Sequence, residues 1–586
     1  MPTENPVLLS RHNAHSASYR EPAYIPSAGP IVYQSVTLRA ASEWALNVLD
    51  VDAFFLYHDY GRAQAYLRNT KNLCFQAPIQ VVRFSRCAYY SIFRMTGMNG
   101  CSPDAMSEAV AHKHFLQDLE LQISRILSCL TPHNLRSFDR WRLGTCIPQG
   151  IFGVDGYLAR CQPHILHLHL QTDGTCFQAQ PGLEGLSQLH DLKVLSWNGI
   201  QHRSEVQSLQ RTLQCNHLHL RSFTVAFKPS TFANSLSWSL LTRSGDEPGH
   251  ALRSMPFASL KELSLSRITL PTYLPPDDIL TFRGLCSLSF IRLVYFEGCF
   301  DILKDDHRYM NALSEFLLSF RGLQNLHLHQ SNFPPLGAAF VGAIHGHPDT
   351  LKSLVYHERQ LVQLDESGMF EEDRDVNPTW AGKCDHTIDL CPLTFLALAI
   401  CPKTAQTILE PTRAHTQLQL LHLRLSGPER LHQNLALEIR TLLIESERTS
   451  SEGTFAPGSN LLDDKPNTYD PSRVRQIATL QSETPPSMPA AKAFISFARW
   501  AFGPQGIPSL RVLAFGDFSH EDRYEAQRFL VRRLDRPKES RVVSECLGFV
   551  PLDFADLESW DGLSGNGARF LAACPGNSLM ESPYDF

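Results

Sequence analysis

The sequence predicts an α/β fold: a leucine-rich-repeat solenoid with short parallel strands on its concave face and helices and loops on its convex face. One short pattern of apolar residues recurs through much of the 586-residue chain. Up to Leu418, successive copies are 25 residues apart at the closest, as from Leu260 to Leu285, and 42 at the widest, from Leu351 to Leu393. The shorter spacings fit a strand and a returning helix, and helical periodicity between copies supports that unit.

The recurring pattern places apolar residues at positions i, i+3 and i+5. The last two lie two residues apart, so in a strand they point to the same face. The first packs beneath the strand, and each unit buries its apolar side only by stacking on the next. The copies are Ile165/Leu168/Leu170, Leu192/Leu195/Trp197, Leu220/Phe223/Val225, Leu260/Leu263/Leu265, Leu285/Leu288/Phe290, Leu323/Leu326/Leu328, Leu351/Leu354/Tyr356, Leu393/Leu396/Leu398, Leu418/Leu421/Leu423 and Leu510/Leu513/Phe515. Leu135 and Phe138 begin an earlier copy, in which Arg140 interrupts the third position.

A long helix is predicted over 104–130, ahead of most copies. Apolar residues recur there at steps of three and four, from Leu116 through Ile123 to Leu130, and Asp104 is the expected N-cap. Shorter helices are predicted at Ser42–Tyr57, Ser314–Phe320 and Leu435–Leu443.

The pattern divides the chain into six segments. We predict a disordered N-terminus at 1–30, a partly helical lead-in or cap at 31–130 that includes a strand in Ile31–Arg39, and leucine-rich repeats at 131–445. A disordered insertion, rich in Ser, Thr, Pro, Glu and Asp, follows at 446–490. The last repeat or repeats occupy 491–546, and 547–586 form a C-terminal cap or tail.

Composition excludes several classes of protein. The net charge of −6 gives no reason to expect nucleic acid as a partner. No stretch approaches the length of about 20 apolar residues that a membrane helix needs, so no membrane association is expected. Fifteen scattered cysteines are too dilute for a disulfide scaffold and are expected to be small buried side chains. These features favour a cytoplasmic or nuclear protein.

No metal site is expected, although three histidines share one column of the predicted sheet. His169 and His327 are five repeats apart, which at about 4.8 Å per strand is far beyond the reach of one ion. The pairs His167/His169 and His327/His329 each lack a third ligand. Cys384, His386 and Cys391 have only Cys401 as a nearby fourth ligand, and an ordinary loop is the favoured interpretation.

No enzyme activity, catalytic residue or cofactor is predicted. His114 and Asp118 match a short acyltransferase-like motif, but four residues apart in a helix they are expected to be a solvated contact. The glycines at 562, 565 and 567 follow no strand and open no clear helix, so they do not form a nucleotide loop. The chain is therefore expected to bind rather than to catalyse.

The predicted binding surface is the concave face of the late repeats. Phe395, Leu420 and Val512 would face outward there, and exposed apolar patches often mark partner sites. His422 and Arg424 would add polar specificity for an unidentified protein partner. The alternative is that the chain's own C-terminus covers this face.

The C-terminal segment offers a means of covering it. Phe554, Leu557 and Trp560 in Pro551–Asp561 would lie on one face of a helix. This helix could cap the last repeat, lie in the groove or dock onto a partner.

The chain resembles the fungal F-box/leucine-rich-repeat proteins over roughly residues 31–545. The resemblance is carried by "LKELSLSRITL" (Leu260–Leu270), "LQNLHLHQSNF" (Leu323–Phe333) and "VYQSVTLR" (Val32–Arg39), the last similar to the segment after the F-box. It implies the substrate receptor of an SCF-type ubiquitin ligase, in which an F-box binds a Skp-type adaptor and the repeats bind the substrate. The 30 residues before Ile31 cannot hold an F-box, so an adaptor is expected only if one lies upstream of Met1. The alternative is a repeat scaffold with no link to ubiquitin.

Overall fold

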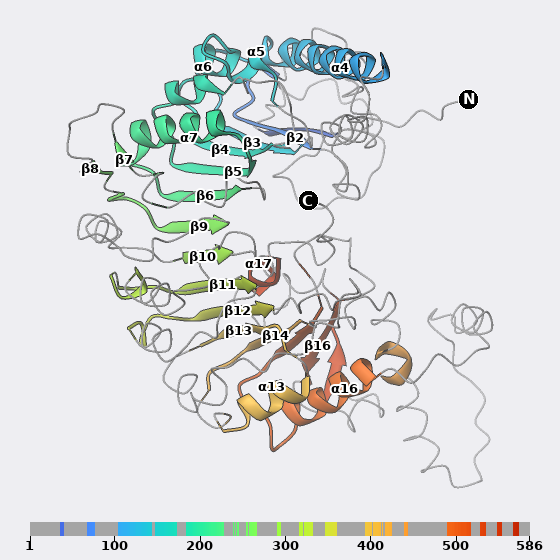
Figure 1. Ribbon diagram of the computed structural model, residues 1–586. Helices are drawn as coiled ribbons and strands as arrows, with labels where there is room; N and C mark the ends of the chain where they lie inside the picture. The colour runs from blue at the N-terminus through green and yellow to red at the C-terminus, as the bar shows by residue number, and fades with distance from the viewer. Residues whose placement is uncertain are drawn as a thin grey trace, which may run out of the picture. The chain divides into compact units, whose positions relative to one another are not determined.

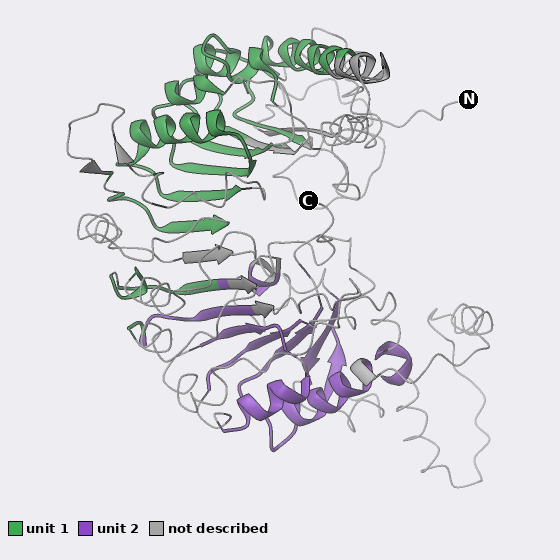
Figure 2. Ribbon diagram, viewed as in Figure 1, with its two compact units in different colours: residues 1–327, 342–347 green, residues 328–341, 348–586 purple. Residues whose placement is uncertain are grey.

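Parallel strands recur along the chain, most of them at the predicted apolar triplets. The computed structural model describes residues 35–39, 67–76, 103–142, 147–172, 183–227, 238, 241, 243–244, 253–255, 257–266, 290–294, 316–319, 321–331, 346–359, 393–400, 402–411, 413, 416–424, 439–443, 489–516, 518, 528–534, 548–553 and 567–572. The chain forms two compact units, unit 1 with residues 1–327 and 342–347, and unit 2 with residues 328–341 and 348–586 (Figure 2).

The strands of unit 1 pair in parallel with their neighbours along the chain, apart from one local ribbon (Figure 1). The parallel strands are β1 (Ser35–Arg39), β2 (Asn72–Gln76), β3 (Ser137–Arg142), β4 (His167–Gln171), β5 (Val194–Ile200), β6 (Ser222–Phe227), β9 (Glu262–Ser266) and β10 (Phe290–Val294). The ribbon pairs β7 (Arg243–Ser244) with β8 (Arg253–Ser254) in antiparallel fashion. Strand β11 (Asn325–Ser331) crosses the boundary between the units.

One backbone arrangement recurs where neighbouring strands begin. The carbonyl of the residue just before a strand accepts hydrogen bonds from two successive N–H groups, those of the residue just before the next strand and of that strand's first residue. Arg136 bonds in this way to Leu166 and His167, Leu166 to Lys193 and Val194, Lys193 to Arg221 and Ser222, and Arg221 to Lys261 and Glu262. In unit 2, Lys352 bonds to Thr394 and Phe395, Thr394 to Gln419 and Leu420, and Gln419 to Arg511 and Val512. The repeating contact sets the register of each strand against the previous one.

Helices lie on one side of the strands of unit 1 (Figure 1). They are α4 (Pro103–Leu127), α5 (Gln149–Phe152), α6 (Tyr157–Cys161), the 3-10 helix η3 (Glu184–Gln188) and α7 (Arg203–Asn216). The prediction of a long helix over 104–130 is confirmed by α4. That helix begins at Pro103, so Asp104 lies inside the first turn and not at the N-cap.

The strand ladder begins earlier than the sequence pattern suggested. Strand β1 pairs with β2, and β2 pairs with β3, so parallel pairing starts within the segment interpreted as a lead-in. At β2 the i, i+3, i+5 pattern reads Thr70/Leu73/Phe75, and all three residues are buried. A buried threonine at the first position hid this copy from a search for apolar residues.

Two other strands depart from their predicted registers. A bulge in β3 pairs Trp141, not Arg140, with Leu170 of β4, so an aromatic residue completes the copy that Arg140 interrupts. Strand β10 begins at Phe290, and Ile291 and Leu293 pair with Leu263 and Leu265 of β9. The predicted frame is wrong by three residues, because Leu288, Ile291 and Leu293 satisfy the same spacing as the frame starting at Leu285.

Unit 2 combines parallel pairing with an antiparallel end. Strands β12 (Ser353–Arg359), β13 (Phe395–Leu398), β14 (Leu420–Leu423) and β15 (Val512–Phe515) pair in parallel. Strand β16 (Phe529–Arg533) pairs antiparallel with β15, and β17 (Phe549–Pro551) pairs antiparallel with β16. Helices α13 (Pro402–Leu409) and α16 (Pro489–Phe502) pack on one side, and the short helix α17 (Gly567–Ala572) packs on the other (Figure 1).

Several predictions concern residues outside the described ranges. They include the N-terminal 30 residues, the helix at 42–57, the insertion up to residue 488, the cysteines 384, 391 and 401 with His386, and Phe554, Leu557 and Trp560. Among the helices that are described, none is both long and apolar enough to cross a membrane.

Candidate binding surface

The strands of each unit have two faces. One face is covered by helices, α4–α7 in unit 1 and α13 and α16 in unit 2, and the opposite face is termed the second face. Side chains alternate between the faces, so residues two apart share one. In unit 2, Phe515 packs against Phe494 of α16 at a ring-centroid distance of 4.8 Å. Its neighbour Ala514 therefore belongs to the second face, where it joins the cluster that includes α17.

The second face of unit 2 is built from rows that run across the strands. Register aligns Phe395, Leu420 and Val512 in one row. A second row holds Val355, Ala397, His422, Ala514 and Leu530. The strands thus bring together four of the five residues predicted to bind a partner, and Arg424 follows directly after β14.

The predicted exposure of this surface is wrong. Phe395 is 6% exposed, Arg424 3%, and Leu420, His422 and Val512 are each 0% exposed. In β13, β14 and β15 every residue is buried, so both faces of these strands are covered. The role of these residues in binding a partner stays a prediction, but water does not reach them here.

The cover comes from the chain's own C-terminal region, as in the alternative interpretation. Phe570 of α17 stacks on Phe395, with ring centroids 5.4 Å apart and an interplanar angle of 30°. Leu571, Phe518 and Leu552 complete the apolar cluster. Among the described residues the covering helix is α17. Of the predicted Pro551–Asp561 segment, Pro551 ends β17 and Leu552 packs against the cluster, whereas Phe554, Leu557 and Trp560 lie outside the described ranges. Burying Phe570 and Leu571 contributes about 1.5–3 kcal/mol per side chain.

Polar groups lie at one edge of this apolar cluster. The Nε2 atom of His422 is 2.6 Å from the carbonyl oxygen of Gly516, and the ring meets Phe518 edge-on with centroids 5.5 Å apart. The His357 ring lies 6.3 Å from that of His422. The backbone N–H of Arg424 donates to the carbonyl of Leu398. These residues are part of the interior and do not offer polar specificity at the surface.

The second face of unit 1 has the opposite character. Strands β4, β6 and β9 alternate, with apolar residues buried towards the helices and polar residues partly or fully exposed. His167 is exposed on this face, and the half-buried positions are His169, Gln171, Ser222, Thr224, Glu262, Ser264 and Ser266. The Ser222 hydroxyl donates to Glu262 at 3.0 Å, which links two adjacent strands. The sequence did not mark this face as a binding surface, because polar side chains are also expected on a strand face that is simply exposed to water.

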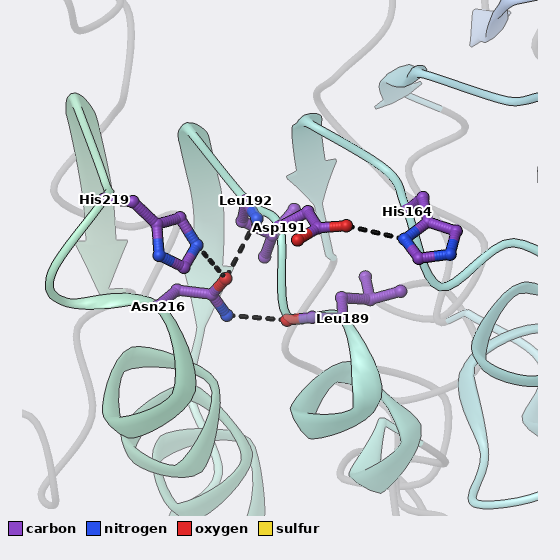
Figure 3. Close-up of polar contacts among 6 residues, drawn as sticks. All are labelled: His164, Leu189, Asp191, Leu192, Asn216 and His219. Atoms are coloured by element: carbon purple, nitrogen blue, oxygen red, sulfur yellow. Dashed lines mark hydrogen bonds and ion pairs between the residues drawn. The ribbon is translucent and has the colours of Figure 1, made fainter.

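Side-chain amides connect successive repeats behind this face (Figure 3). Asn216 at the end of α7 accepts a hydrogen bond from the backbone N–H of Leu192 and donates to the carbonyl of Leu189. Gln162 makes the same pair of contacts, with Leu135 and Thr131. Both amides satisfy a buried N–H at the first position of the apolar pattern, where an unpaired donor would be costly. The two amides thus connect neighbouring segments of the ladder by hydrogen bonds.

An exposed histidine–carboxylate contact lies near these amides (Figure 3). The Nδ1 atom of His164 lies 2.6 Å from Asp191, and both side chains are about half exposed. At that exposure the contact contributes little to stability.

A buried carboxylate sits at the start of α7. Glu205 accepts hydrogen bonds from the N–H groups of Gln201 and His202, each 2.9 Å long, and forms a capping box. Desolvation by burial raises the pKa of Glu205, and these hydrogen bonds oppose the rise. Such a group is a structural cap, because its carboxylate oxygens are directed at the backbone of its own helix.

Two further sequence motifs lie at least partly within the described residues. No group of three or more His, Cys, Asp and Glu side chains within them could hold a metal ion. His114 and Asp118 are both exposed on α4. Gly567 does open a helix, contrary to the prediction, but α17 has only six residues. Comparisons with protein-family models, with curated proteins and with solved structures find nothing that matches this chain.

Proposed function

We propose that the protein is a leucine-rich-repeat solenoid that binds another protein on the second face of unit 1. The observation that supports this most directly is the contrast between the two second faces. The face of β4, β6 and β9 presents polar side chains to water, whereas the face of β13–β15 lies under α17 and its neighbours. The open face is therefore the surface available to a partner.

The chemistry of the open face suits a polar interface. Thr224 and Ser264 carry hydroxyl groups and pair in register on adjacent strands, and neighbouring strands of a sheet lie about 4.8 Å apart. Imidazoles on β4 and the Glu262 carboxylate on β9 flank them. Interfaces between proteins that also exist apart carry many direct and water-mediated hydrogen bonds. We expect a partner that presents complementary donors and acceptors over several strands.

Site-specific photo-crosslinking in cells tests this function. A photoreactive residue at Thr224 should crosslink to one protein species, while the same residue at exposed Gln214 on α7 should not. In parallel, Thr224→Arg should reduce recovery of that species about tenfold or more, and Gln214→Arg should leave it unchanged. Equal crosslinking from both positions, or none from Thr224, would contradict the proposal.

The family resemblance supports a narrower proposal, that the bound protein is a substrate for ubiquitination. The segment "VYQSVTLR" that carries part of the resemblance contains β1, the first strand of the parallel ladder. If an F-box precedes it in the gene, the full-length product should co-purify with a Skp-type adaptor from cytoplasm or nucleus. A full-length product that binds its partner without any adaptor would favour a scaffold with no ubiquitin link.

A further inference from the structure

We propose that the second face of unit 2 is a binding site for a short helical peptide with adjacent aromatic and aliphatic side chains, and that α17 occupies this site in cis. A partner segment with the same two anchors would replace α17 in trans. This inference concerns unit 2 alone and does not depend on the role proposed for unit 1.

The occupant makes its contacts through very few side chains. Phe570 and Leu571 both join the cluster on the second face, and Phe570 stacks on Phe395. The helix around them, GARFLA, consists otherwise of one arginine and small residues, and Gly567 is buried. Among the side chains that the structure describes in α17, Phe570 and Leu571 are therefore the two apolar anchors, the kind of side chain through which a short helical segment is held on another surface.

The sheet beneath α17 does not depend on it for hydrogen bonding. The parallel strands β12–β15 bond to one another through their backbones, and β16 pairs with β15 at the end. The corresponding face of β4, β6 and β9 in unit 1 stands partly exposed on the same kind of ladder. A cover is therefore no requirement of this strand arrangement, and α17 is an addition to it.

The covering helix has little stability of its own. Isolated helices shorter than about 12–15 residues are marginal in water, and α17 has six residues. Its conformation is thus held by Phe570 and Leu571 in their positions on the strands. A segment bound through two anchors can exchange, whereas a strand held by a ladder of backbone bonds cannot do so without local unfolding.

The chemistry of the face beneath α17 also determines which kind of peptide could replace this helix. Removal of the helix would uncover Phe395, on which Phe570 stacks, within a cluster that also contains Leu420 and Val512, and such an apolar site favours an apolar ligand. A peptide that offers an aromatic ring to Phe395 and an aliphatic side chain next to it restores the same contacts.

Fluorescence anisotropy with a labelled peptide of residues 563–573 tests the proposal on the full-length protein. Wild-type protein should bind this peptide weakly, because α17 already fills the site. The variant Phe570→Ala/Leu571→Ala should bind it at least about tenfold more tightly, since apparent affinity rises with the fraction of open sites. The variant Leu218→Ala, at an exposed leucine of unit 1, should match wild type.

A second peptide and a milder variant remove the remaining alternatives. The peptide with alanine at both anchors should bind neither protein. If the double variant loses its circular dichroism spectrum, Leu571→Ala with hydrogen exchange on β13–β15 replaces it, and excess peptide should slow exchange there. Absence of peptide binding to every folded variant, or unfolding of both variants, overturns the proposal and makes α17 permanent core. Crosslinking from Thr224 is read separately, so either proposal can fail alone.

Discussion

Strands β6 and β14 occupy comparable places in their ladders yet differ in what they bury. The second face of β6 carries Ser222 and Thr224, both partly exposed, while that of β14 carries Leu420 and His422, both fully buried. The helix-facing residues of the two strands are apolar alike. The apolar residues that face the helices are therefore common to both ladders and define the fold. The residues of the second face differ between the units, and their polarity determines whether that face is exposed to water or covered by another part of the chain.

A charge introduced on the second face should lower the stability of unit 2 far more than that of unit 1, and this is the largest difference that we expect between the units. Leu420→Asp places a carboxylate in a fully buried apolar row, and we expect a loss of more than about 4 kcal/mol in the free energy of unfolding of unit 2. Thr224→Asp at the comparable position of β6 should change stability by less than about 0.5 kcal/mol. Thermal denaturation followed by circular dichroism measures both.

Similar effects of Leu420→Asp and Thr224→Asp on the free energy of unfolding would contradict the difference between the two faces. A mild effect of Leu420→Asp would mean that α17 leaves easily and admits water, and a severe effect of Thr224→Asp would mean that unit 1's face is covered as well. Leu121→Asp, at an exposed position on α4, serves as the control for adding a charge.

The two units also satisfy the first N–H of the apolar pattern differently. In unit 1 an amide from the following repeat accepts this bond, as Asn216 does for Leu192, whereas in unit 2 the nearby Thr416 hydroxyl accepts it from Leu418. Asn216→Ala leaves a buried donor unpaired and should cost about 2–3 kcal/mol. Thr416→Ala should cost about 1 kcal/mol, because water can reach this half-buried site. Urea denaturation compares the two, and equal costs would remove this distinction.

The antiparallel end of unit 2 depends on one guanidinium group. Arg533 on β16 donates to the carbonyls of Phe502, Ile507 and Leu510 at 2.7–3.0 Å. Its guanidinium also lies over the Phe502 ring, 5.4 Å from the centroid. Arg533→Met should lower the unfolding free energy by about 2 kcal/mol, and Arg533→Lys should restore only part of it, since lysine lacks the planar fork. Arg440→Met, at an exposed arginine, should have no effect, and a neutral Arg533→Met would show that water serves these carbonyls equally well.

The smallest predicted effect depends on pH and concerns unit 1. Because burial raises the pKa of Glu205, the folded state holds this proton more tightly than the unfolded chain. The stability from this group is fully present below the ordinary glutamate pKa of about 4.3 and is lost as pH rises through the raised value. The stability of Glu205→Gln relative to wild type should therefore increase as the pH rises from acid to neutral. Melting temperatures of both proteins across pH 4–8 test this, and parallel curves would contradict it.

The sequence was sufficient to predict most of the parallel ladder, because each strand repeats the same spacing on its helix-facing side. It failed where that spacing is degenerate or incomplete. The run from Leu285 to Leu293 fits two frames, and only pairing with β9 selects the second. Thr70 hid the copy at β2, since a buried hydroxyl does not register as apolar. The bulge in β3 replaced Arg140 by Trp141, which depends on a neighbouring strand.

The candidate surface was predicted in composition but not in exposure. Phe395, Leu420 and Val512 do align on one face, because residues two apart in a strand must. The cluster that buries them includes Phe570 and Leu571, which follow β15 by more than fifty residues and belong to no repeat. A contact of that range between unlike segments leaves no periodic trace in a single sequence.

The separation between β15 and α17 also has a consequence during synthesis. Strand β15 ends at Phe515 and α17 begins at Gly567, so a ribosome adding about 5–20 residues per second needs roughly 3–10 seconds to travel between them. Throughout that interval the nascent chain can pair its strands but lacks Phe570, the residue that stacks on Phe395. The apolar surface around Phe395 is therefore more exposed until α17 has been synthesised, and chaperones that recognise apolar surface can bind it during this interval.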